Sequence, residues 1–413
     1  QRGLKIKTQA NAGYIDIVEA NIFEEKKIEK LFSKADYCIN LIGILYEKGK
    51  GNTQTPSILI LLPAYRPGKI FSKVLENVHL LKAKHTNIEV LCLMQHASGQ
   101  LVQEAKSYGF LVEEKAFDHL EGNSYHHALK FLVKKIQNLS SLPHFTMILD
   151  KDNMIDSSFI EAIPADYFDK YEVIQGKREA LSSKGSTSLF DQVSELLNDV
   201  MFRAANSRLN VLPEVSGSAA LIETNTFCNA IENLDSKAPG YDKNFMVQLL
   251  TGNPVKGIFI PASKIYEEKT DDLDSFQPQR VRWFGEQYYN ALFSGKKLIQ
   301  AWVKGRWSAL VYLIILWRPP RSTQLFIVPT FGILELSAFL VSKEWFLGFP
   351  VLSVASLMII ASILIFLISH HLLGKAIVYG MHLPGLVLAN FKSASNSIKA
   401  KNRGKFIHTE HKL

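Results

Sequence analysis

The stretch Ser57-Ile-Leu-Ile-Leu-Leu-Pro-Ala-Tyr-Arg-Pro-Gly68 begins as an apolar run and ends in turn-forming residues. A run of this length closed by proline and glycine is typical of a buried strand. After it, short apolar runs alternate with segments of helical periodicity. We predict strands over residues 57–62, 88–93, 110–112 and 145–149, and helices over residues 71–84, 101–108 and 124–139. This alternation predicts an α/β domain with a mostly parallel sheet and helices on both faces.

Composition narrows the class of protein. The 413-residue chain is 47% hydrophobic and carries a formal net charge of +8. These values fit a soluble domain joined to a few membrane helices. The basic residues form no run dense enough for a nucleic-acid surface, so we expect no nucleic-acid partner. The cysteines at positions 38, 92 and 228 are odd in number and far apart, which argues against a disulfide framework or a zinc site.

Two apolar runs lie toward the C-terminus, at residues 325–341 and 349–373. The second has no acid, lysine or arginine and is long enough to cross about 30 Å of hydrocarbon. Residues 307–317 form a shorter run with tryptophan at both ends, as an interfacial helix has. Basic residues precede the first run and follow the second. We therefore predict an interfacial and transmembrane region over 301–390 and a basic cytoplasmic tail over 391–413.

Two carboxylates follow the predicted strand at residues 145–149. They are Asp150 and Asp152, separated by one lysine. Mg²⁺ in proteins takes one or two carboxylates together with substrate phosphates. Ligands of open α/β sheets bind at the carboxyl ends of strands. The pattern predicts a site for a divalent cation and a diphosphate, and an acidic loop that arose by chance is the alternative.

The segment Gln279-Arg-Val-Arg282-Trp283 (Q-x-x-R-W) lies shortly before the apolar runs. With the D-x-D pair and the P-x-Y sequence at 63–65 upstream, in this order, it resembles the processive-type inverting glycosyltransferases of family 2, which build cellulose, chitin and hyaluronan. The resemblance covers residue 57 to the C-terminus. It implies a GT-A nucleotide-diphospho-sugar transferase domain over 54–300, followed by transmembrane helices. The expected activity is inverting transfer from a nucleotide-diphosphate donor to a glycan or lipid acceptor at the membrane, with a multi-pass topology and a cytoplasmic catalytic domain.

The resemblance also implies a donor site. Its expected residues are Pro63, Tyr65, Arg66, Asp150, Asp152, Gln279, Arg282 and Trp283. Within this set, Asp150 and Asp152 are expected to hold Mg²⁺ or Mn²⁺ as well as the diphosphate. On a helix, Gln279, Arg282 and Trp283 are expected to point the same way. An arginine binds phosphate oxygens in a bidentate fork, and a tryptophan offers a face on which a sugar stacks.

Acceptor and base are implied in the same way. The small-residue turn at Gly217 and Ser218, together with Trp283, is expected to bind the acceptor. Asp242 falls where the family places its general base, the carboxylate that takes the proton of the acceptor hydroxyl. Capping of the helix that begins near Phe245 is the alternative role for Asp242.

The chain departs from the family pattern in places. Residues 93–98 lack the acidic pair that usually contacts the nucleobase, and Tyr241 stands where an acid is common. These departures motivate an alternative function, that of a degenerate non-catalytic member that binds nucleotide sugars or scaffolds a polysaccharide assembly. Adjacent His126 and His127 point in different directions on a helix, so we expect no metal site there.

Residues 1–53 differ in character from the rest of the chain. Their pattern predicts one strand–helix–strand unit, and residues 48–56 form a polar, Gly-rich linker. The unit resembles the middle of a nucleotide-sugar epimerase or an epimerase-like complex I subunit. Those families bind the dinucleotide through a G-x-x-G-x-x-G turn that is missing here, so we expect a truncated Rossmann fragment that does not bind NAD.

Overall fold

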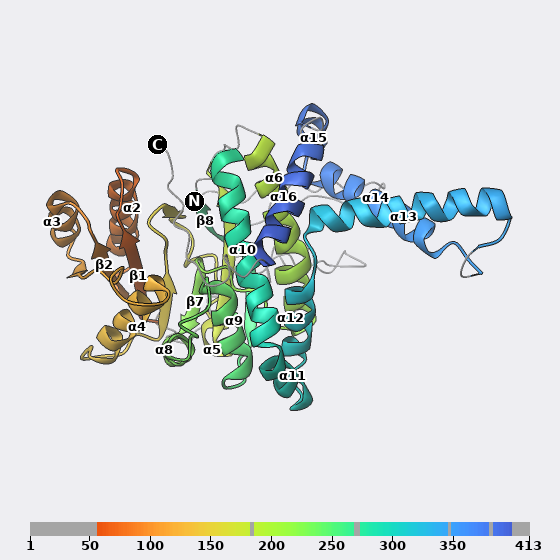
Figure 1. Ribbon diagram of the computed structural model, residues 1–413. Coiled ribbons are helices and arrows are strands. Elements are labelled where there is room, and N and C mark those ends of the chain that lie inside the picture. The colour runs from red at the N-terminus through yellow and green to blue at the C-terminus, as the bar shows by residue number, and fades with distance from the viewer. Residues whose placement is uncertain (1–55, 182–185, 268–272, 346–347, 380–382, 399–413) are drawn as a thin grey trace, which may run out of the picture. The chain divides into compact units, whose positions relative to one another are not determined.

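The structure, a computed structural model, describes residues 56–398 except 182–185, 268–272, 346–347 and 380–382 (Figure 1). These residues belong to one compact unit, Gln54–Leu413. The predicted epimerase-like fragment, most of the linker and residues 399–413 of the predicted tail lie outside the described residues. The fragment and its lack of NAD binding therefore stay predictions.

Within the described residues, one eight-stranded sheet has the strand order β3-β2-β1-β4-β7-β6-β8-β5. The strands are β1 (Ile58–Tyr65), β2 (Ile88–Gln95), β3 (Leu111–Glu114), β4 (Phe145–Ile148), β5 (Asn153–Ile155), β6 (Val173–Ala180), β7 (Ala220–Glu223) and β8 (Gly257–Glu267). Strands β3, β2, β1 and β4 are parallel neighbours. This half of the sheet confirms the strand predictions to within a few residues.

Helices cover both faces of that half, as predicted. They are α2 (Ile70–Lys84), α3 (Gly99–Ser107), α4 (Ser124–Gln137), α8 (Thr224–Glu232) and α9 (Asp242–Thr251). Successive β1 side chains enter different cores, since side chains alternate across a strand. Leu59 and Leu61 pack with α4, α8 and α9, whereas Ile58, Ile60 and Leu62 pack with α2 and α3. Burial on both faces is the reason for the unbroken apolar run at 57–62.

The other half of the sheet corrects the expectation of a mostly parallel sheet. Strand β7 is antiparallel to both β4 and β6, and β5 is antiparallel to β8, while β6 and β8 are parallel. The sheet is therefore mixed. A buried strand has the same apolar pattern in either direction, so its periodicity does not reveal the direction of its neighbour.

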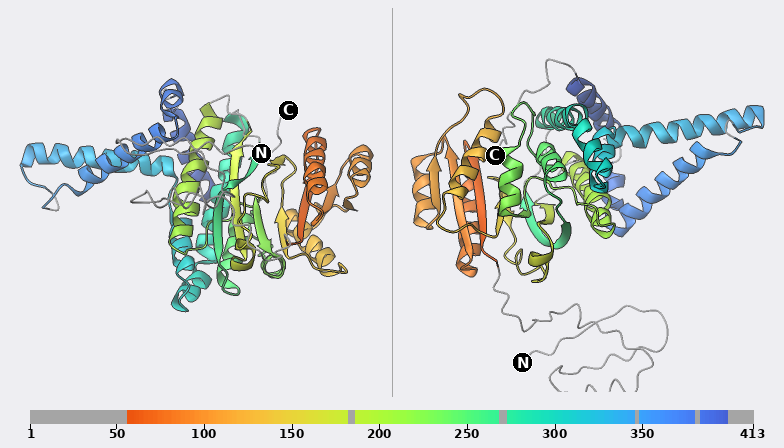
Figure 2. Two further views of the ribbon diagram at one scale, coloured as in Figure 1. Left: turned by 180° about the vertical axis from the view of Figure 1, so that it is seen from behind. Right: turned by 90° about the horizontal axis from the view of Figure 1, so that it is seen from below.

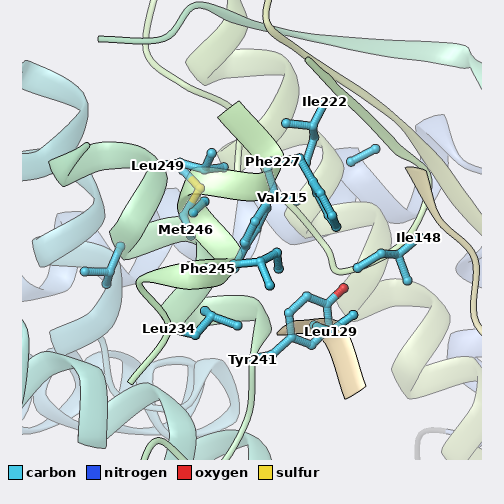
Figure 3. Close-up of a cluster of buried hydrophobic side chains, with 14 of the residues drawn as sticks. Leu129, Ile148, Val215, Ile222, Phe227, Leu234, Tyr241, Phe245, Met246 and Leu249 are labelled. Carbon is cyan, nitrogen blue, oxygen red and sulfur yellow. The ribbon is translucent and has the colours of Figure 1, made fainter. Parts of the chain in front are cut away.

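The core on one face of the sheet is rich in aromatic side chains around α9 (Figure 3). Phe227 of α8 and Phe245 of α9 have ring centroids 5.8 Å apart. Tyr241, the residue before α9, packs 6.2 Å from Phe245 and 5.0 Å from Tyr125 of α4. This packing holds the beginning of α9 close to the sheet edge where β4 ends.

The remaining helices follow β5, β6 or β8. They are α5 (Tyr167–Lys170), α6 (Ser186–Asn198), the π-helical segment η2 (Asp199–Ala204), α7 (Ala205–Arg208), α10 (Leu273–Phe293), α11 (Gly295–Val303), α12 (Trp307–Trp317), α13 (Arg321–Ser342), α14 (Val351–Ser369), α15 (Leu373–Tyr379) and α16 (Leu383–Ile398). Helix α10 packs against α9, α12 and α16. The predicted interfacial helix over 307–317 coincides with α12, and α15 and α16 follow α14, with α16 packed on α10.

The predicted spans correspond to α13 and α14, which lie side by side (Figures 1 and 2). In the described part of the chain, one helix is long and apolar enough by length and composition to cross a membrane, and it is α14. Helix α13 contains Pro329 and Glu335, and its apolar part, Ile327–Ser342, is shorter. The multi-pass prediction is therefore not confirmed.

Candidate active site

One edge of the sheet gathers most of the predicted site. Strands β1, β2 and β4 are parallel neighbours, so their carboxyl ends lie together at this edge. Because β7 runs antiparallel to β4, the turn before β7 reaches the same edge. Strands β6 and β8 also end there, since β6 opposes β7 and β8 is parallel to β6. Topology alone thus brings residues from six strands to one place.

The D-x-D pair lies in the turn between β4 and β5. Asp150 and Asp152 are half-buried, and Lys151 between them donates from Nζ to the carbonyl oxygen of Tyr65 at 2.9 Å. Asn153, the first residue of β5, donates to the Ser218 hydroxyl at 2.8 Å. The turn is therefore tied to the end of β1 on one side and to the turn before β7 on the other.

Several charges converge on Asp150. Burial raises the pKa of Asp150 to about 7, and the negative charges of Asp152, Asp242 and Glu267 add to this increase, against the opposing charge of Arg178. Arg178, on β6, forms an ion pair with Glu267 at the end of β8 and donates to the carbonyl of Ser216 at 2.6 Å. Carboxylates and cations thus alternate at this edge, and Asp150 is the carboxylate on which most of the negative charges act.

Gly217 brings the small-residue turn against Asp242. Its φ of +80° is in the left-handed region, and a Cβ there would lie 2.6 Å from Oδ1 of Asp242. The Tyr241 hydroxyl donates to the carbonyl of Gly217. Gln175 supports the turn from β6, because its amide donates to the Ser216 hydroxyl and its carbonyl accepts the Ser216 N–H. The glycine thus makes room for the carboxylate of Asp242.

Helix α9 begins at Asp242, and Tyr241 at the N-cap position makes no side-chain cap. The cap comes instead from α10, where Glu286 accepts the backbone N–H of Lys243 at 2.8 Å. Glu286 is buried and fills the space beside Gly240, where a Cβ would lie 2.3 Å from the carboxylate. Capping, the alternative role of Asp242, is therefore carried out by Glu286.

The ends of β1 and β2 form a second cluster. Arg66 and His96 directly follow these strands, and both have positive φ values, 44° and 55°. The rings of Tyr65 and His96 are perpendicular with centroids 5.6 Å apart, and the Arg66 guanidinium lies 5.3 Å from the Tyr65 ring. His96 pairs with Asp118 at 3.0 Å. An aromatic ring, a cation and a carboxylate are thus assembled where the usual acidic pair is missing.

Helix α10 carries the Q-x-x-R-W segment. The positive charge of Arg282 lowers the pKa values of Asp242 and Glu286, against the larger raising effect of burial, so Arg282 acts on both carboxylates. Trp283 lines a cavity between α6, α10 and α12, and Arg280 stacks on its ring at 4.5 Å. Arg282 does not line that cavity. Gln279 lies in α10, and its side chain is outside the described residues.

The part of the chain from β4 onward matches a known family. Residues 145–383, more than half of the chain, match the model of the family "Glycosyl transferase family group 2". The chain belongs to this family. It is a glycosyltransferase by that assignment, and the processive subtype is not confirmed. No curated protein matches the sequence significantly.

Solved glycosyltransferases resemble the chain distantly. A mannosyltransferase from Pyrobaculum calidifontis, in complex with GDP-Man and Mn²⁺, is 11% identical with a TM-score of 0.49, covering 84% of this chain and 89% of that one. TarS of S. aureus (1–349) is 14% identical with a TM-score of 0.38, at 59% and 65% coverage. Glucosyl-3-phosphoglycerate synthase from Mycobacterium tuberculosis, with Mn²⁺ and UDP-glucose, is 13% identical with a TM-score of 0.38, at 56% and 79% coverage. The family match therefore decides the assignment.

Three predicted site residues of this glycosyltransferase are buried within the protein, Gly217 and two residues with side chains, Pro63 and Ser218. Pro63 is buried in β1, where it lies opposite Leu93 of the neighbouring strand β2. Ser218 is fully buried, and its hydroxyl accepts from Asn153. Contact of these two side chains with donor or acceptor is therefore not supported. The geometry gives both a structural role, because each shapes the backbone that precedes a site loop.

The histidine pair of α4 is structural as well. His126 is buried, with Nε2 3.3 Å from the carbonyl of Gly240, and burial lowers its pKa to about 4. His127 contacts the carbonyl of Glu121 at 2.8 Å. Among the residues that the structure describes, no group of three or more histidines, cysteines or acids is arranged to hold a metal ion.

Sequence reasoning missed three residues of the transferase site. Arg178, Glu267 and Glu286 reach it through strand pairing and helix packing. Glu286 carries a usable signal, because it lies four residues after Arg282 and hence on the same side of a helix. Arg178 and Glu267 have no local signal, since only the order β7-β6-β8 brings them to the edge.

Proposed function

We propose that this glycosyltransferase moves a sugar, with inversion, from a nucleoside diphosphate donor to an acceptor at a membrane surface. The observation that carries the proposal is the meeting of Asp150, Asp152 and Asp242 at one sheet edge beside α10. Asp150 and Asp152 are suited to binding the donor through a cation, and Asp242 is suited to removing the proton of the acceptor hydroxyl. A mixed sheet with its site at the strand ends supports the GT-A type of fold for residues 54–300.

The donor would lie across the ends of β1, β2 and β4. Tyr65 offers an aromatic face for a nucleobase, and Arg66 a cation for a phosphate. From α10, Arg282 supplies a second cation close to the base, suited to the diphosphate as it leaves. The turn with Asp150 and Asp152 lies beside the end of β1, because Lys151 donates to the carbonyl oxygen of Tyr65.

The residues present fit a divalent cation. Asp150 and Asp152 provide two carboxylates. Burial, and after it the negative charge of Asp152, raises the pKa of Asp150, and a cation would offset both effects. Mg²⁺ or Mn²⁺ needs only one or two carboxylates when phosphate oxygens complete its coordination. When bound, the ion would stabilise the charge that develops on the diphosphate.

Asp242 is the proposed base. It would accept the proton of the acceptor hydroxyl, whose oxygen forms the new bond to the anomeric carbon. The bond from that carbon to the diphosphate oxygen breaks, and its electron pair leaves with the nucleoside diphosphate. Burial raises the pKa of Asp242, which makes it a stronger base than an exposed aspartate. The Tyr241–Gly217 hydrogen bond and the Glu286 cap hold it in position.

The test combines a donor screen by nucleotide release with calorimetry of UDP and GDP. We expect Asp242→Asn to bind nucleotide with little change and to lose about 10²–10⁴-fold in turnover, the usual contribution of a general base. Asp152→Asn should weaken the binding of UDP and GDP. Addition of EDTA, which removes divalent cations, should then weaken nucleotide binding no further. Turnover of Asp242→Asn at the wild-type rate would refute the assignment of the base.

The same assays address the non-catalytic alternative. A wild-type chain that binds a nucleoside diphosphate but turns over none of the donors would support the scaffold function. Asp169→Asn serves as the charge-matched control, because Asp169 is exposed and lies in α5. It should behave as the wild type in both assays.

A further inference from the structure

A polar cavity of about 140 Å³ lies on the side of α10 that carries Trp283. Residues of α6, α9, α10, α12, α16 and the loop after α12 line it. Its acids already have partners: Asp191 pairs with Arg280, Glu195 with Arg203, and Glu214 with Lys243 at 3.9 Å. The volume exceeds the roughly 30 Å³ that one water occupies, so the cavity has room for a small polar group.

Arg318 also lines the cavity, and among the described residues it forms no ion pair, although the negative charge of Glu214 acts on it. Its guanidinium lies 4.3 Å from the ring of Phe202, and its Nη1 is buried without a hydrogen-bond partner among the described residues. Burial lowers the pKa of Arg318, so its charge is held at a cost. Its backbone is fixed, because the Gln287 amide donates to its carbonyl at 2.7 Å. Arg318 is half-buried, and a guanidinium with one buried, unpaired nitrogen favours an anionic ligand.

Arg318 also lines a second, open hollow of about 480 Å³. The remaining lining residues are Leu313, Ile314 and Trp317 of α12. Ile314 is 64% exposed and Trp317 is 55% exposed, so α12 presents an apolar surface there. One arginine thus joins a polar cavity to an apolar groove.

We propose that this cavity and groove bind a lipid phosphate, with the phosphate at Arg318 and the hydrocarbon chain along α12. A free phosphate would leave the apolar groove uncovered, and a neutral lipid would leave the guanidinium unpaired. The groove is continuous along the chain with α13, which begins three residues after Arg318 and exposes apolar side chains of its own. An arginine fork is well suited to phosphate oxygens.

The position of the cavity suggests how the lipid phosphate would take part in sugar transfer. Lys243 and Glu214 line the cavity, and their charges also act on Asp242. A bound head group would therefore lie beside two residues whose charges act on the proposed base. For this placement alone the inference rests on the proposed function, whereas binding of the lipid does not require it.

The experiment measures binding to the full chain in an uncharged detergent, with dodecyl phosphate, dodecanol and inorganic phosphate as probes. We expect dodecyl phosphate to bind most tightly. Arg318→Gln should weaken it about tenfold or more, as expected for the loss of a charge-assisted hydrogen bond. Arg318→Lys, which keeps the charge, should lose less. Ile314→Ser should weaken dodecyl phosphate and leave inorganic phosphate unchanged.

Lys304→Gln is the matched control, because Lys304 is exposed at the end of α11 and lines neither hollow. Unchanged binding in Arg318→Gln and Arg318→Lys, or equal binding of dodecanol, would overturn the proposal. Inorganic phosphate that binds as tightly as dodecyl phosphate would overturn it too, as a free-anion site. A chain that binds dodecyl phosphate through Arg318 but no nucleoside diphosphate would support the lipid site and refute only the proposed function.

Discussion

Gly217 packs so closely against the proposed base, Asp242, that no side chain fits at this position. A methyl group at this position would lie 2.6 Å from Oδ1 of Asp242. The backbone φ of +80° is also one that residues with a side chain rarely adopt. We expect Gly217→Ala to displace Asp242 and to lower the rate of transfer at least tenfold, while nucleotide binding at Asp150 and Asp152 changes little. Turnover and nucleotide calorimetry measure the two effects separately.

Gly109→Ala is a control that distinguishes the displacement of Asp242 from backbone strain as the cause of lost activity. Gly109 has a similar φ of +70°, but a Cβ there would meet no atom within 4 Å. Both variants should lose about 1 kcal/mol of stability from the left-handed conformation. If Gly109→Ala loses as much activity as Gly217→Ala, strain rather than the position of Asp242 is the cause.

Glu286 provides a pH-dependent prediction. Burial, and after it the charge of Asp242, raises the pKa of Glu286 from 4.5 to about 7. The folded protein therefore binds more protons than the unfolded chain in this window, and stability falls as pH rises through it. Its contribution is fully present below about pH 4.5 and is lost above pH 7. Each pKa unit corresponds to 1.36 kcal/mol, so the contribution is at most about 3 kcal/mol.

Glu286→Gln should remove this contribution while its side-chain oxygen still accepts the N–H of Lys243. We expect the free energy of unfolding to fall less steeply with pH in the variant than in the wild type. Denaturant titrations over the window measure the two slopes. Identical slopes would show that Glu286 does not titrate there.

At the level of elements, the contact of α13 with α14 depends on small and polar residues. A Cβ on Gly332 would lie 2.1 Å from the Ser356 hydroxyl, which itself donates to the carbonyl of Val328 at 2.9 Å. Glu335 is buried and accepts from both the backbone N–H and the hydroxyl of Ser353. Close approach through glycine and serine is typical of helices that pack in lipid.

Gly332→Val should separate these two helices. Overpacking of this kind costs typically about 1–3 kcal/mol, so we expect a lower midpoint of thermal unfolding in detergent. Gly374→Val is the control, because Gly374 lies near the beginning of α15 and a Cβ there meets no atom within 4 Å. Equal midpoints for the two variants would mean that α13 and α14 do not pack closely in solution.

At the scale of the whole chain, α14 presents apolar side chains to its surroundings. The helix has a mean hydropathy of 2.9, and only 6% of its apolar window is buried. Leu357 and Ile365 are 68% and 67% exposed. Nineteen residues at about 1.5 Å each match the hydrocarbon thickness of a bilayer, so a membrane is the medium that suits this helix.

We therefore expect the chain to stay in the membrane fraction after a high-salt wash. Leu357→Lys with Ile365→Lys should release it, since each lysine near the centre of a span costs about 2.5–3.5 kcal/mol. Leu80→Lys with Leu209→Lys is the control, because both leucines are similarly exposed on the α/β domain. Flotation with liposomes distinguishes the pairs; release of the wild type by salt would contradict membrane insertion.

Local patterns determined the elements and the order of the site motifs. An apolar run closed by Pro and Gly is enough to mark β1, and two acids after a strand are enough to mark Asp150 and Asp152, because strand ends in parallel sheets share an edge. Those inferences need only neighbours in the sequence. The strands β1 to β4 and the helices between them were therefore predictable, and the family followed from motif order.

Only the tertiary structure decided the rest. The reversal of β7 brings Gly217 to the edge, and the order β7-β6-β8 brings Arg178 and Glu267 there. The packing of α10 on α9 supplies the Glu286 cap, and α12 beside α10 leaves Arg318 unpaired among the described residues. These contacts join residues far apart in the chain, and their energies depend on burial and on neighbouring charge. Such quantities exist only once the chain has folded.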